Sequence, residues 1–69
     1  MYNNLEAEMA RNKITRKNLA VVLGVRYATI IDKLKGRSTF TLDEAFKIRD
    51  TYFPGLTIEY LFHKEEKAV

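Results

Sequence analysis

The sequence contains no cysteine, no tryptophan, one proline and three glycines among its 69 residues. Without cysteine, the chain can form neither a disulfide bond nor a thiolate metal site. Its longest apolar stretch, LAVVLGV, is far shorter than the roughly 20 residues that a membrane-spanning helix needs. No apolar run follows the first residues either, which argues against a signal peptide. We therefore expect a cytoplasmic protein that does not bind membranes.

Signatures of catalysis and of cofactor binding are also missing. The single histidine, His63, has no cysteine or second histidine with which to share a metal ion. Gly24, Gly36 and Gly55 each lie where a predicted helix stops, so they do not form a phosphate-binding loop. Helix caps and solvated faces account for most of the carboxylates. We expect no enzymatic activity, no metal or other cofactor, and no small-molecule ligand.

Positive charge is concentrated in the middle of the chain. Residues 11–37 contain eight lysines and arginines against one acidic residue, which is a net +7. The whole chain carries +3, so the remaining residues sum to −4. Such a distribution is typical of a domain that presents one face to a polyanion, although a solvated surface that keeps the protein in solution would also explain it.

Capping residues and apolar spacing predict a single all-α domain over residues 1–69, with an ordered core of about 3–62 and a charged tail at 63–69. We expect helices at about 4–11, 16–23, 26–35, 42–53 and 58–62. Each of the five begins after a residue whose side chain can cap it, except the third. The four expected caps are Asn3 (with Glu6), Thr15, Thr41 (with Glu44) and Thr57.

Apolar periodicity indicates which side of each later helix faces the core. In the third helix the inward residues are Ile30 and Leu34, while the facing of Ile31 and Lys33 stays open. In the last two helices the residues expected to face inward are Leu42, Ala45, Phe46, Ile48 and Tyr52, followed by Ile58, Leu61 and Phe62.

The segment from Arg16 to Lys35 contains a recognisable motif. Helical spacing of Leu19, Ala20 and Leu23 is interrupted by Gly24, which can adopt a positive φ, and a second apolar helix follows. The motif continues through Val25, Thr29, Ile30 and Gly36. It resembles the helix-turn-helix of the phage repressor and Cro family, and the similarity extends over about residues 5–62. The resemblance implies a compact five-helix lambda-repressor-like fold in which helices 2 and 3 form the helix-turn-helix.

The resemblance also implies sequence-specific binding of double-stranded DNA, with a recognition helix at about Arg26–Lys35. Base-reading side chains would be Tyr27, Ala28 and Asp32, and backbone phosphates would be held by Arg16, Lys17, Arg26, Thr29, Lys35 and Arg37. The physical chemistry agrees, because a small side chain such as Ala28 can approach a thymine methyl and a carboxylate can accept from a cytosine amino group. Alternatively, Tyr27 packs on a neighbouring helix and Asp32 is a surface residue that repels off-target DNA.

In the same family, subunits usually meet through the loop after helix 4 and the final helix. The matching segment implies a homodimer on a palindromic operator, with Pro54, Leu56 and Tyr60 at the interface. Leu56 is the most suggestive of these, because an apolar side chain at a loop tip has little reason to be there within one chain. Several family members also join helices 1 and 3 by a buried ion pair, and the matching positions here are Met9 and Leu34, whose side chains we expect to touch in an apolar contact.

Two other functions compete with a transcriptional regulator. The same fold could serve as a protein-interaction module, such as an antitoxin-like or antirepressor-like partner. The chain could also be a structural helical domain of a longer protein. The +7 middle segment favours DNA binding, whereas the aromatic residues near the C-terminus are compatible with all three.

Overall fold

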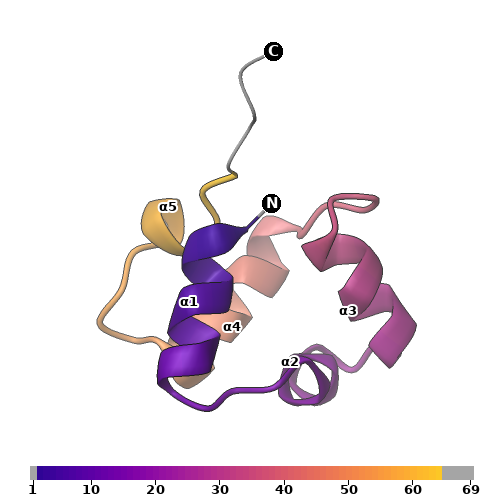
Figure 1. Ribbon diagram of the computed structural model, residues 1–69, viewed down its shortest axis with the longest axis horizontal. Coiled ribbons are helices and arrows are strands. Elements are labelled where there is room, and N and C mark those ends of the chain that lie inside the picture. The colour runs from indigo at the N-terminus through magenta and orange to yellow at the C-terminus, as the bar shows by residue number, and fades with distance from the viewer. Residues whose placement is uncertain (1, 65–69) are drawn as a thin grey trace.

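The computed structural model describes residues 2–64, which fold into five α-helices with no strand among them (Figure 1). The helices are α1 (Asn3–Arg11), α2 (Arg16–Leu23), α3 (Tyr27–Leu34), α4 (Leu42–Tyr52) and α5 (Ile58–Leu61). All five predicted helices are present, and the all-α prediction is confirmed. None of the helices in this part of the chain is long and apolar enough to cross a membrane.

Threonine caps fix the start of three helices. Thr15 accepts a hydrogen bond from the Asn18 amide at 3.1 Å, and the Asn18 side chain accepts one from the Thr15 amide at 2.8 Å. Thr41 and Glu44 form the same reciprocal pair at the start of α4. Thr57 accepts from the Tyr60 amide at 3.1 Å. These bonds satisfy backbone donors that the first helical turn leaves free, as the sequence predicted.

The predicted cap of the first helix is wrong. Asn3 lies inside α1, and the cap position belongs to Tyr2, which makes no side-chain capping bond. Tyr2 is only 2% exposed, and its ring packs edge-on against Phe40 and Phe62, with centroids 5.4 and 6.1 Å away. Burial of this large ring anchors the segment that leads into α1.

A left-handed glycine joins α2 to α3. Gly24 has φ 67° and ψ 33°, a conformation that strains residues with a Cβ atom, and its position at the end of α2 was predicted. The Val25 amide then donates to the Ala20 carbonyl at 3.0 Å, which keeps the turn short. The two helices contact each other and bury Leu19, Ala20 and Ile30 between them and the core.

The core lies where all five helices converge, and Figure 1 shows α1 crossing in front of α4, with α5 beside α1 and with α2 and α3 on the opposite side. Met9 and Leu34 are 6% and 5% exposed and belong to this one cluster; whether their side chains touch stays a prediction. The cluster consists of Tyr2, Leu5, Met9, Leu19, Ala20, Ile30, Leu34, Ile48, Phe53 and Leu61.

The inward face of α4 is narrower than the apolar pattern predicted. Ala45 and Ile48 are buried, but Leu42 is 64% exposed and Phe46 is 39% exposed, so both of those assignments are wrong. Residues 42 and 46 are one turn apart, so they share a side of the helix. The Arg49 guanidinium lies 5.3 Å from the Phe46 ring centroid and shields part of it.

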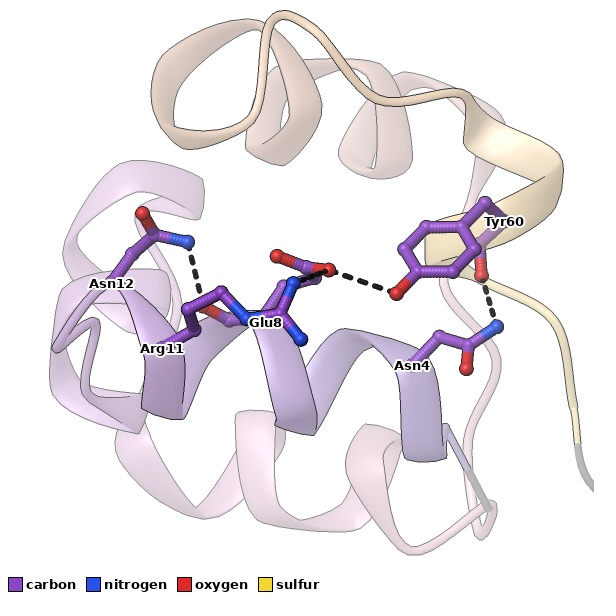
Figure 2. A network of polar contacts seen from close by, with 5 residues as sticks. All are labelled: Asn4, Glu8, Arg11, Asn12 and Tyr60. Atoms are coloured by element: carbon purple, nitrogen blue, oxygen red, sulfur yellow. Dashed lines mark hydrogen bonds and ion pairs between the residues drawn. The ribbon is translucent and has the colours of Figure 1, made fainter.

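A polar network connects α1 to α5 (Figure 2). The Glu8 side chain is 7% exposed, and one of its oxygens accepts from the Tyr60 hydroxyl at 2.8 Å and from Arg11 at 2.9 Å. At the other end of α1, the Asn4 amide donates to the Tyr60 carbonyl at 2.9 Å. Both ends of Tyr60 are therefore tied to α1, which holds the single-turn helix α5 in place.

Candidate nucleic-acid interface

The outer side of α3 presents the residues predicted to read bases. Its inner side is formed by Ile30, Lys33 and Leu34, all buried. Tyr27 is 53% exposed and Ala28 is also exposed, while the Asp32 side chain is 48% exposed. The helical repeat places Ala28 and Asp32 one turn apart on the same side. The predicted base-reading set is therefore accessible together, on the side of α3 that faces away from the core.

Two adjoining surface hollows bring cations from α2 and α3 to one side of the molecule. The first is lined by Lys17 and Tyr27 over an apolar floor that includes Met9. The second is lined by Lys35 together with Ile31 and Leu34. Arg16 and Glu6 line both hollows. Four of the residues predicted to contact DNA thus surround one continuous stretch of surface: Arg16, Lys17, Tyr27 and Lys35.

Two of the predicted phosphate-binding arginines are engaged in exposed ion pairs. Arg16 lies 3.1 Å from Glu6, and Arg37 lies 3.5 Å from Asp32. All four side chains are between 41% and 69% exposed. Exposed pairs of this kind contribute only about 0 to 1 kcal/mol, so a polyanion can compete for either arginine at small cost.

The remaining predicted cations have no acidic partner among the described residues. Lys17, Arg26 and Lys35 are exposed, and each lies in or next to the α2–α3 unit. Arg26 is the residue before the first turn of α3, and its carbonyl accepts the Thr29 amide at 3.0 Å. Thr29 itself is half-buried. Phosphate contact by these residues stays a prediction, but three of them carry unneutralised charge.

The facing of Ile31 and Lys33, which the sequence left open, is resolved. Ile31 is half-buried and lines the second hollow. Lys33 points inward and is 7% exposed. Its ammonium nitrogen lies 3.0 Å from Glu44 Oε1. Lys33 is therefore withdrawn from the basic surface.

The segment predicted to form the dimer interface is more engaged within the chain than expected. Leu56 is half-buried and packs against the core, so the expectation that it lacks an intramolecular role is wrong. Phe53, three residues before Leu56, is 3% exposed. Pro54 is exposed, and Tyr60 is 38% exposed. The hydrogen bond to the Glu8 carboxylate raises the pKa of Tyr60 above its ordinary value of 10.0, because it stabilises the protonated phenol.

The described residues form no candidate metal site. Within residues 2–64, no three histidine, cysteine, aspartate or glutamate side chains are placed together to hold a metal ion. Comparisons with protein-family models, with curated protein sequences and with solved structures each find no match to this chain. A functional assignment therefore depends on the residues and their arrangement.

Proposed function

We propose that this protein is a sequence-specific double-stranded DNA-binding transcriptional regulator of the Cro or repressor kind. In this proposal α2 and α3 form a helix-turn-helix, and α3 is the recognition helix. The observation that carries it is the combination of an accessible outer side of α3 with three exposed, unpaired cations around it, Lys17, Arg26 and Lys35. A polyanion with a groove about 12 Å wide suits such a surface, since the duplex would receive the helix while its phosphates meet the cations.

The proposed contacts divide into reading and positioning. Ala28 offers close approach to a thymine methyl, and Tyr27 and Asp32 offer polar groups to base edges. Asp32 is bound to Arg37 in the free protein. On DNA, Arg37 would turn to a phosphate, and the freed carboxylate would accept from a cytosine amino group. This exchange gives up one weak ion pair for two charge-assisted contacts.

The proposed assembly on DNA is a homodimer on a palindromic operator. Two copies of α3 would then lie about 34 Å apart, one turn of B-DNA, and enter successive major grooves. Exposed Pro54 and Tyr60 remain the proposed contacts, with Leu56 contributing only its accessible part. Such a regulator, of phage or prophage type, would act in the cytoplasm.

Selection of bound duplexes from a random pool tests the proposal directly. We expect a palindromic consensus and two protomers per duplex. Three free cations per protomer give about six phosphate contacts per dimer, so log K should fall with log salt at a slope of about −5. If Arg16 and Arg37 also exchange their ion pairs for phosphate contacts on DNA, the slope becomes steeper still. A selection that yields no enriched sequence, or an affinity independent of salt, would contradict the proposal.

Matched lysine variants separate the proposed surface from general charge. Lys17→Gln removes a cation beside Tyr27, and we expect the slope to become shallower by about 1.8, or 0.9 for each of two protomers. Lys47→Gln removes another exposed cation, from α4 and outside that surface, and should leave the slope nearly unchanged. Equal effects of the two variants would show that net charge, and not this surface, governs binding.

A protein-interaction module is the second candidate, favoured by apolar side chains that the fold leaves uncovered. Val21 is 74% exposed on α2, and Leu42 and Phe46 are exposed on α4. Proteins of this size bury apolar groups where they can, so such residues are typical of contact surfaces when they cluster. Failure to bind any duplex, together with stable binding of a protein partner that protects these residues, would favour this candidate.

A further inference from the structure

The one buried lysine of α3 is held by three groups from outside the helix. Lys33 Nζ lies 3.0 Å from Glu44 Oε1 and donates to the Thr39 carbonyl at 2.9 Å. The Phe40 ring centroid lies 5.7 Å from the same nitrogen. An ammonium group has three donors and a compact charge, so a carboxylate, a carbonyl and a ring satisfy it well. Lys33 is therefore fully engaged within the protein, unlike its neighbour Lys35.

The partner carboxylate has a second structural role. Glu44 Oε1 also accepts from the Thr41 amide at 2.9 Å, which is half of the capping box of α4. Partial burial raises the pKa of Glu44, but hydrogen bonds from Thr41 and Lys33 and the charge of Lys33 outweigh that effect and hold the pKa below its ordinary value of 4.5. The same oxygen thus joins the last turn of α3 to the first turn of α4.

The loop between α3 and α4 is fixed by these contacts at its far end and by backbone bonds at its near end. Gly36 turns the chain with φ 84°, and the Arg37 amide donates to the Asp32 carbonyl at 2.9 Å. The Thr39 carbonyl accepts a hydrogen bond from Lys33, and the Phe40 ring packs edge-on against Tyr2 and Phe62. The segment that carries Lys35 and Arg37 is therefore held at both ends, by the backbone bond to Asp32 and by the contacts of Thr39 and Phe40.

We propose that Lys33 is a positioning residue for DNA binding and not a phosphate contact, which is an inference that rests on the proposed function. Through Glu44 and Thr39 it sets the orientation of α3 relative to α4 and the course of the loop that presents Lys35 and Arg37. A buried ion pair is often no more stabilising than apolar side chains of the same volume. What the pair supplies here is orientation, because the Glu44 carboxylate and the Thr39 carbonyl accept the same ammonium group and so tie α4 and the loop to one point on α3.

Two variants and a matched control test this role. Lys33→Met retains the length of the side chain, and Glu44→Gln retains an oxygen for the Thr41 amide. We expect each to weaken operator binding about twofold to thirtyfold, as residues that act without touching the ligand do. The salt slope should not change, because no phosphate contact is lost. The double variant should bind no more weakly than Lys33→Met alone, since both changes break one link.

Lys35→Met is the control, two residues along the chain and exposed. It should make the slope shallower by about 1.8 per dimer, and its effect should add to that of Glu44→Gln. A shallower slope for Lys33→Met, together with unchanged binding by Glu44→Gln, would overturn the proposal and make Lys33 a phosphate contact.

A measurement without DNA separates failure of this inference from failure of the proposed function. Amide hydrogen exchange should quicken at Arg37 and Ser38, whose amides are bonded to the Asp32 carbonyl, in both Lys33→Met and Glu44→Gln. It should stay at the wild-type rate in Lys35→Met. If wild-type protein binds no duplex, the proposed function fails while the exchange data still report on the link. Unchanged exchange in both variants would show that Lys33 does not hold the loop.

Discussion

Two leucines that the apolar pattern assigned to the core differ sharply in exposure in the structure. Truncating each of them tests the burial that the structure assigns. Leu34 is 5% exposed within the main cluster, whereas Leu42 is 64% exposed on α4. Truncating Leu34 to alanine removes buried methyl groups and leaves a cavity, which should cost about 2 to 4 kcal/mol. Leu42→Ala removes groups that water already reaches, so its effect should stay within about 0.5 kcal/mol.

The stability lost in Leu34→Ala is large relative to the total free energy of unfolding. A domain of this length has a free energy of unfolding of about 3 to 10 kcal/mol, so Leu34→Ala should unfold a visible fraction of the protein at room temperature if the stability is at the lower end. Urea titration followed by helical circular dichroism measures both variants, with the midpoint shift read at a shared slope. A loss below about 0.5 kcal/mol for Leu34→Ala, or equal losses for the two, would refute the burial described here.

The remaining predictions concern a turn and an acid transition. Gly24→Ala should cost about 1 to 2 kcal/mol of stability, because φ at this position is 67°. Gly55→Ala should cost little, because φ there is not left-handed and no atom lies within 4 Å of the added carbon. Equal urea midpoints for the two variants would contradict this. Because the folded pKa of Glu44 lies below 4.5, its contribution to stability is fully present above that pH and is lost as the pH falls through the folded value. Glu44→Gln should therefore show a shallower loss of stability below about pH 4.5, and identical acid profiles would rule out this source.

Local chemistry made much of the fold predictable from the sequence. The caps at Thr15 and Thr41 need only a partner three residues along the chain, and both were identified together with the glycine turn between α2 and α3. The same kind of reasoning failed at Asn3, because the burial of Tyr2 against Phe40 and Phe62 depends on distant segments. Capping bonds depend on residues a few positions apart and can be predicted from them, whereas the burial of a side chain depends on segments far away in the sequence.

In the proposed DNA-binding surface too, local features were predictable and long-range contacts were not. Basic residues around α3 could be identified from their sequence positions, but which of them form ion pairs in the fold could not. Half of the eight basic residues in the 11–37 segment have an acidic partner, and those partners include residues as remote as Glu6 and Glu44. The facing of Lys33 stayed open in the sequence, because apolar spacing assigned only Ile30 and Leu34 of that helix to the core. Its inward orientation follows from the Glu44 carboxylate, whose capping role was foreseen without its second partner.

The three aromatic rings of Tyr2, Phe40 and Phe62 also bear on how the protein folds and how long it stays folded. Their edge-to-face contacts join the start of the chain, the α3–α4 loop and the residue after α5. Closing such long loops is entropically costly, whereas the α2–α3 contact forms between neighbouring segments. We therefore expect the rings to meet after the rate-limiting step of folding. Interactions absent from that transition state slow unfolding without hastening folding, so we expect this cluster to lengthen the lifetime of the native protein.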